Sequence, residues 1–189
     1  MDPIERSPLG KPVVYDSPYD PGLLHPMPRS TQRQLLGLNA SQLPFLGADL
    51  WTAYEVSWLN PKGKPQLAIA RFVVPCESSH IIESKSFKLY LNSYSDHRFD
   101  TLEQVREQLR TDISRAIWHG GAVQAQVGVQ LITPDRFEQE TIQELEGLLL
   151  DRLDLECDSN KPNPDLLRAQ FDEQPVSVTL VSHLLKSNC

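Results

Sequence analysis

The segment HIIESKSFKLYLNSY, residues 80–94, concentrates residue types that can bind small molecules. Glu83 is followed at once by Ser84 and Lys85, so a carboxylate, a hydroxyl and an ammonium group fall within one helical turn. An ionised carboxylate accepts neighbouring N–H donors, whereas a hydroxyl, an ammonium and helix N-terminal N–H groups suit a phosphate. Taken alone, these residue types favour a plainer role for Glu83, because the helix dipole stabilises an acidic residue in a first turn.

Cysteine and histidine give weaker signals. Cys76, Cys157 and Cys189 are an odd number at long spacings, which predicts neither a disulfide framework nor a paired Cys-x-x-Cys metal site. Cys76 and His80 are each suited to binding zinc, but no third ligand is evident nearby. We therefore interpret Cys76 as a strand-end cysteine and predict no metal site.

Composition and charge restrict the class of protein. The chain has 189 residues, 40% of them apolar, without an apolar run near the roughly 18 residues that a membrane span needs. The N-terminal MDPIERSPLG is acidic at once and has no apolar signal-peptide region. A net charge of −7 argues against non-specific nucleic-acid binding. These features predict a cytoplasmic protein with no membrane partner and no direct nucleic-acid partner.

The elements that would position the segment follow from its neighbours. Residues 48–60 and 65–76 are rich in aromatic and β-branched residues and flank the turn PKGK, which predicts a β-hairpin. We expect residues 80–94 to form one helix and residues 100–121 to contain a second. The chain thus enters the candidate binding segment directly from the hairpin.

The second helix has the clearest pattern. Thr101 and Gln104 predict a capping box at its start, and Gly120 with Gly121 predicts its end. Its apolar residues recur at helical spacing and should share one buried face: Leu102, Val105, Leu109, Ile113 and Ile117.

Two further strands are expected after the helices. Residues 122–132 alternate between apolar and polar side chains, and residues 147–157 do so less regularly. The resulting order is β-β-α-α-β-β. We predict an α+β fold with a four-stranded antiparallel sheet and both helices on one face, because consecutive helices must bury their apolar stripes against something.

The rest of the chain sets the domain boundaries. Residues 1–47 are proline-rich and predict an irregular N-terminal arm lying over a domain at 48–157. Residues 158–175 predict a linker, and residues 176–189 open with a new strand-like run. One strand cannot form a domain, so this last segment is expected to be the first strand of a second, truncated domain.

Three motifs carry a resemblance to a known family. ESKSFKLYLNS, LLGLNASQLPFLGADLWTAYEVSWLNPKGKPQ and the closing SHLLKSNC resemble the long form of the QueF family, the NADPH-dependent 7-cyano-7-deazaguanine reductases of queuosine and tRNA modification. The resemblance covers most of the chain and is weakest at residues 137–175. It implies tandem tunnelling-fold (T-fold) domains, each of the β-β-α-α-β-β kind predicted above, and typically a homodimer.

The resemblance also implies roles for individual residues. Cys189 would be the nucleophile that forms a thioimide with the substrate nitrile. Ile82, Glu83 and Ser84 would bind the deazapurine, with Glu83 accepting both N–H donors of its guanine-like edge. Ser84 and Lys85 would contact NADPH, for which the sequence has no GxGxxG motif after a strand.

One departure from the family leaves alternatives open. Family members continue beyond the cysteine into a second domain that supplies the general acid, whereas Cys189 is the last residue here. The chain is therefore expected to be either a truncated piece or an enzyme that has lost its second half, with its activity alone in question. The alternatives are a non-catalytic deazapurine-binding or dimerising T-fold module and, less favoured, a zinc cyclohydrolase-like enzyme with Cys76 and His80 as ligands.

Overall fold

A computed structural model describes most of the chain. The described residues are 18–39, 42–119, 121–141, 146–156, 163–166, 168, 174 and 176–182. The chain divides into two compact units, Met1–Gln139 and Glu140–Cys189. The first unit contains an α+β fold, in agreement with the predicted class.

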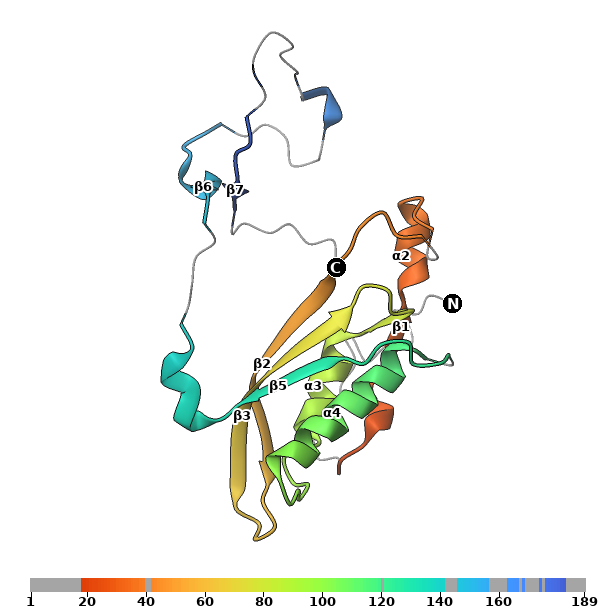
Figure 1. Ribbon diagram of the computed structural model, residues 1–189, viewed down its shortest axis with the longest axis vertical. Helices are drawn as coiled ribbons and strands as arrows, with labels where there is room; N and C mark the ends of the chain where they lie inside the picture. Colours follow the sequence, from red (N-terminus) through yellow and green to blue (C-terminus); the bar gives the residue numbers. More distant parts are fainter. Residues whose placement is uncertain are drawn as a thin grey trace. The chain divides into compact units, whose positions relative to one another are not determined.

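The sheet of the first unit is antiparallel and has the strand order β2-β3-β5 (Figure 1). Its strands are β2 (Ala48–Leu59), β3 (Pro65–Pro75) and β5 (Gly128–Ile132), so the predicted hairpin is confirmed. In the hairpin turn, the Asn60 side chain accepts N–H groups from two lysines at 2.9 and 3.0 Å. Gly63 has a φ of 82°, a backbone conformation that glycine adopts without strain.

Helices α3 (Ser84–Asn92) and α4 (Leu102–Ile117) both cover one face of this sheet (Figure 1). The prediction of one helix over residues 80–94 is wrong at its start. There the chain forms a short strand, β4 (His80–Ile82), which pairs antiparallel with β1 (Pro26–Pro28). The helical pattern could not reveal this pairing because the partner strand lies more than fifty residues earlier in the chain.

The start of α4 shows how closely a local signal can set a boundary. Thr101 is the N-cap, and its side chain accepts the N–H of Gln104 at 3.2 Å, as predicted. The Gln104 side chain reaches one residue further back than in a standard capping box and accepts the N–H of Asp100 at 2.9 Å. At the other end, Gly121 donates to the carbonyl of Trp118, while Gly120 lies outside the described residues.

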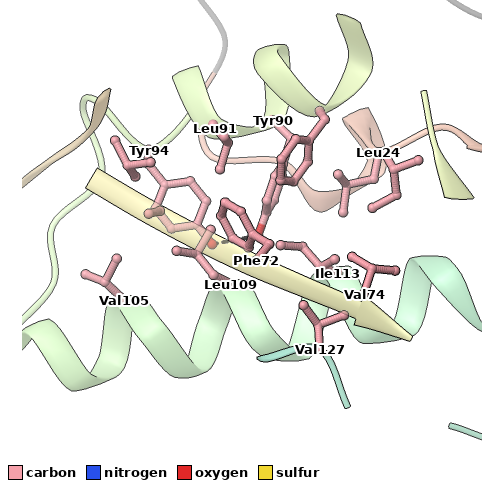
Figure 2. Close-up of a cluster of buried hydrophobic side chains, with 14 of the residues drawn as sticks. Leu24, Phe72, Val74, Tyr90, Leu91, Tyr94, Val105, Leu109, Ile113 and Val127 are labelled. Atoms are coloured by element: carbon pink, nitrogen blue, oxygen red, sulfur yellow. Dashed lines mark hydrogen bonds between the residues drawn. The ribbon is translucent and has the colours of Figure 1, made fainter. Parts of the chain in front are cut away.

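The core lies between the sheet and the two helices. Figure 2 shows Tyr90 and Leu91 of α3 facing Leu109 and Ile113 of α4, with Phe72 of β3 among them. Alternate residues of β3 are buried: Ala68, Ala70, Phe72 and Val74. The period of two in this strand and the helical period in α4 therefore direct their apolar residues into one core.

A buried polar network crosses this core. The Asp112 carboxylate of α4 is 4% exposed and accepts hydrogen bonds from Tyr90 at 2.8 Å, from Tyr19 at 2.5 Å and from Gln108 at 3.1 Å. Tyr94 shares a further hydrogen bond with Tyr90 at 2.7 Å. Burial, and then the negative charge of Asp112 and its hydrogen bond, raise the pKa of Tyr19 well above its ordinary value. Tyr19 and Tyr90 thus stay neutral and donate to the carboxylate.

The segment before the sheet is more regular than its prolines suggest. It contains the 3₁₀ turn η1 (Pro21–Leu23), β1 and helix α2 (Arg29–Leu35). Another 3₁₀ turn, η2 (Pro134–Gln139), follows β5, which itself covers only the second half of the strand predicted at 122–132. None of the helices in the described part of the chain has the length and apolarity needed to cross a bilayer.

The second unit corrects the predicted fourth strand. Of the predicted range 147–157, residues 147–156 are described, and there the chain forms only β6 (Leu148–Leu149) and the 3₁₀ turn η3 (Leu150–Arg152). β6 pairs parallel with β7 (Leu180–Val181), and a further turn, η4 (Pro164–Leu166), lies between them in sequence. In the described residues the antiparallel sheet therefore has three strands, because a short leucine-rich alternation does not specify its partner.

Replacing Asp112 with alanine should destabilise the first unit. The change removes a charged acceptor and leaves the buried Tyr90 hydroxyl short of a partner, so the free energy of unfolding should fall by about 3 kcal/mol. Urea denaturation followed by tryptophan fluorescence measures this, since all three tryptophans of the chain lie in the first unit. Asp96→Ala, at an exposed site, is the control. Equal midpoints for the two variants would contradict the structural role of Asp112.

Candidate functional site

Glu83 lies at the junction between β4 and α3 and is the N-cap of the helix. Its two carboxylate oxygens accept the N–H groups of Lys85 and Ser86, each at 2.8 Å. The residue is only 6% exposed. A carboxylate at this position satisfies two N–H groups that a helix start leaves without a partner and faces the positive end of the helix dipole. The plainer role that residue types favour for Glu83 is thus present in the structure.

The two capping hydrogen bonds do not use all the acceptor positions of the Glu83 carboxylate. Its two oxygens offer about four acceptor positions, of which the two backbone N–H groups take two. The hydroxyl of Ser84 makes only a long contact with one oxygen, at 3.4 Å. The remaining acceptor positions can therefore bind N–H donors of a ligand. The two backbone hydrogen bonds also fix the orientation of the Glu83 carboxylate toward those donors.

The other predicted binding residues are consecutive with Glu83 but differ in environment. Ile82, the last residue of β4, is buried and pairs with Pro26. Ser84 is exposed in the first turn of α3, and Lys85 is partly exposed. The strand-to-helix junction thus places an apolar side chain, a carboxylate, a hydroxyl and an ammonium group in sequence along one short segment.

The helix N-terminus differs from the expectation in one respect. A phosphate was expected to use N–H groups there, but those of Lys85 and Ser86 donate to the Glu83 carboxylate. An anion near this point would therefore have to be bound by side chains, such as those of Ser84 and Lys85.

A cavity of about 660 Å³ lies beside this junction, between α3 and β2. Helix α3 contributes Ser84, Lys88 and Asn92 to its wall, and β2 contributes Trp51 and Tyr54. Its size falls within the usual range for small-molecule sites, and aromatic and polar groups are mixed along it. Ser84 is the member of the predicted set that faces this cavity.

The structure describes one of the three cysteines of the chain. Cys189 lies outside the described residues, as does Cys157. Cys76 is buried at the end of β3, where its N–H donates to the carbonyl of Gly47 at 3.2 Å. No group of three or more histidine, cysteine, aspartate or glutamate side chains in the described ranges could hold a metal ion.

His80 has partners other than a metal ligand set. Its Nδ1 lies 2.9 Å from the Ser79 hydroxyl, and its ring packs edge-on against His119 at 5.3 Å between ring centroids. Burial lowers the pKa of His80, and the neighbouring His119 lowers it further. The imidazole is therefore held neutral by its surroundings near neutral pH.

The segment before the sheet supplies contacts that the sequence does not reveal. Residues 25–29 run along the turn and strand that lead to Glu83, and the Glu83 N–H donates to the carbonyl of His25 at 3.0 Å. His25 in turn donates its N–H to the hydroxyl of Ser86 at 3.1 Å. The arginine in the proline-rich HPMPR motif, Arg29, was a visible but ambiguous signal, since charged residues in such segments are mostly solvated.

Comparison with known proteins agrees with the resemblance found in the motifs. Residues 15–130 match the family model described as nitrile reductase, 7-cyano-7-deazaguanine-reductase N-terminal. The chain is similar to proteins named NADPH-dependent 7-cyano-7-deazaguanine reductase, with 54% identity to that of Delftia acidovorans, 56% to that of Acidovorax ebreus and 56% to that of Verminephrobacter eiseniae. Each alignment covers the whole of this chain and 67% of the relative.

Two substitutions separate capping by Glu83 from any further role. Glu83→Ala should lower the free energy of unfolding by about 1 kcal/mol, because the helix loses its cap. Glu83→Asp should change it by less than about 0.5 kcal/mol, since aspartate is a strong N-cap residue. Urea denaturation of the two variants and the native chain measures both values. A loss with aspartate as large as that with alanine would contradict the cap assignment.

Proposed function

Since the chain belongs to the 7-cyano-7-deazaguanine reductase family of nitrile reductases, we propose that it reduces the nitrile of 7-cyano-7-deazaguanine with NADPH. The product is 7-aminomethyl-7-deazaguanine, an intermediate of queuosine in transfer RNA. The observation that carries this proposal is the position of Glu83 between β4 and α3. Its carboxylate is buried, and its two capping hydrogen bonds leave acceptor positions for a ligand. Glu83 lies inside the part of the chain that matches the family.

Glu83 fixes the substrate through its base. A guanine-like edge presents two neighbouring N–H donors, and a carboxylate accepts both through charge-assisted hydrogen bonds. Because Glu83 is buried, a ligand that lacks these two donors should bind weakly. Such a ligand would remove water from the carboxylate without replacing the lost hydrogen bonds. Ile82 supplies an apolar contact beside it, and Ser84 a hydroxyl.

Cys189 is the proposed nucleophile, on the strength of the SNC motif. Its thiolate adds to the nitrile carbon, and the nitrogen gains a proton, so that the carbon–nitrogen triple bond becomes the double bond of a thioimide. A cysteine suits this step because a thiolate is a strong nucleophile and can leave again later. The thioimide carbon is a better hydride acceptor than the nitrile.

The residues present fit NADPH as the reductant. Ser84 and Lys85 would contact it, and the adjoining cavity has an exposed ammonium, Lys88, one turn further along α3. These side chains suit a phosphate-bearing ligand in a protein whose net charge of −7 would otherwise repel one. When bound, NADPH supplies hydride for the two reductions of the carbon–nitrogen bond.

The proposal extends to the architecture and the setting of the enzyme. We propose a T-fold domain at 48–157, preceded by the arm at 1–47. The linker at 158–175 then leads to the first strand of a second domain at 176–189. The enzyme would act as a homodimer in the cytoplasm on a free base, with no direct contact with nucleic acid or membrane.

Intact-mass measurement tests the covalent step. After mixing with 7-cyano-7-deazaguanine and no NADPH, the chain should gain the mass of the substrate at Cys189, and Cys189→Ala should gain nothing. The Delftia acidovorans relative serves as the positive control. If the relative forms the adduct while this chain binds the base without reacting, the reductase proposal fails for this chain and a non-catalytic binding module replaces it.

The role of Glu83 has its own test. Glu83→Asp should raise the Kd of the base about a hundredfold, because the carboxylate retreats by one methylene and two charge-assisted hydrogen bonds are lost or stretched. Calorimetric titration measures the Kd, with the exposed Glu103→Asp as the matched control. Since aspartate keeps the cap, weak binding by a stable variant separates base recognition from folding. An unchanged Kd would remove Glu83 from the site.

A further inference from the structure

The segment that carries Ile82 and Glu83 depends on a very short pairing. β1 and β4 share only three residue pairs, Pro26 with Ile82 through Pro28 with His80, in a sheet of two strands. Such a ladder is marginal by itself in water. Yet substrate contacts must be held within about 0.5 Å of their productive positions. Contacts from elsewhere in the chain must therefore help to fix this segment. Ser79 donates its hydroxyl to the carbonyl of Ile117 at 3.1 Å, and Arg29 makes the more extensive set of contacts.

Arg29, the first residue of α2, contacts both the turn before β4 and the start of β2. Its Nε donates to the hydroxyl of Ser78 at 3.1 Å, and a terminal nitrogen forms an ion pair with the Asp49 carboxylate. Its backbone N–H also donates to the carbonyl of Ser79 at 3.0 Å. The Arg29 side chain is 11% exposed, so this is a largely buried cation with two defined partners.

The contact continues from Arg29 into β4. Ser78 is fully buried, and its hydroxyl donates to the carbonyl of His80 at 3.0 Å. A chain of polar contacts thus runs from Asp49 at the start of β2, through Arg29 and Ser78, to His80, the first residue of the strand that precedes Glu83. The long, stable hairpin is in this way tied to the short binding segment.

We propose that Arg29 is a positioning residue that holds the turn before β4 and thereby sets the place of Ile82 and Glu83 for substrate binding. The inference rests on the proposed function of Glu83. The guanidinium is suited to the task because its planar fork donates in two fixed directions. Lysine keeps the charge but has one compact donor group, which cannot hold Asp49 and Ser78 in the same geometry.

Arg29→Lys is the discriminating variant, because it retains the buried charge that alanine would remove. Its Kd for 7-cyano-7-deazaguanine should rise about tenfold, while its Kd for NADPH stays within about twofold, since misplacement affects the base contacts. Hydrogen exchange at the Glu83 amide should accelerate, because its acceptor, the His25 carbonyl, lies next to the segment that loosens. Arg106→Lys, which alters an ion pair on the exposed side of α4, is the matched control and should change neither.

A second variant changes the other partner of the ion pair between Arg29 and Asp49. Asp49→Asn leaves Arg29 in place but removes its charged partner, and it should reproduce the selective loss of base affinity. If Arg29→Lys weakened both ligands equally and lowered the melting temperature in step, the residue would be only structural and the proposal would fail. A variant that behaves like Arg106→Lys would overturn it as well.

The exchange measurement keeps this inference distinct from the proposed function. If the native chain binds no deazapurine, the function assigned to Glu83 fails, and the Glu83 amide then decides about Arg29 alone. Faster exchange in Arg29→Lys than in Arg106→Lys supports the positioning role, and equal exchange refutes it.

Discussion

Asp112 places a negative charge in the apolar interface between α3 and α4, and the surrounding structure is arranged to satisfy it. The tyrosine hydroxyls come from α3 and from the segment before the sheet, and Gln108 comes from the preceding turn of α4. Because each donor must reach one carboxylate, the helices cannot slide or rotate against each other without breaking hydrogen bonds to an ion. Close apolar packing around Phe72 and Ile113 then fills a space whose dimensions are already set.

Because these hydrogen bonds fix α3, they also fix its N-terminus, where the proposed base-binding residue Glu83 lies. Glu83 ends the short strand, starts the helix and, in the proposed reaction, recognises the base. The Glu83 side chain is fixed in position because the backbone N–H groups of Lys85 and Ser86 each donate to one of its two carboxylate oxygens. The N-terminal turn of α3 thus holds the buried carboxylate in one position, where its remaining acceptor positions can bind a ligand.

Sequence reasoning succeeded where the information was local. The β2–β3 hairpin and α4 follow from periodicity, a turn and a cap within a few residues of one another. The motif directed attention to Glu83, whose binding role stays a prediction. Sequence reasoning failed where structure depends on distant partners. Residues 80–82 were assigned to a helix because their pairing with residues 26–28 leaves no local trace, and the leucine-rich 147–157 could not disclose its partner strand. The link from Arg29 to Asp49 is likewise tertiary, so no spacing rule could find it.

The two prolines of β1 have a consequence for the surface of the molecule. His25 and Arg29 form their backbone hydrogen bonds toward the 79–83 segment, so the alternating residues Pro26 and Pro28 are directed to the opposite, outer edge. Proline has no N–H, and that outer edge consequently offers no backbone donors within the strand. A strand from another molecule would find only carbonyl acceptors there and could not form a complete ladder. The two prolines thus disfavour intermolecular sheet growth at this edge of the segment that leads to the candidate site.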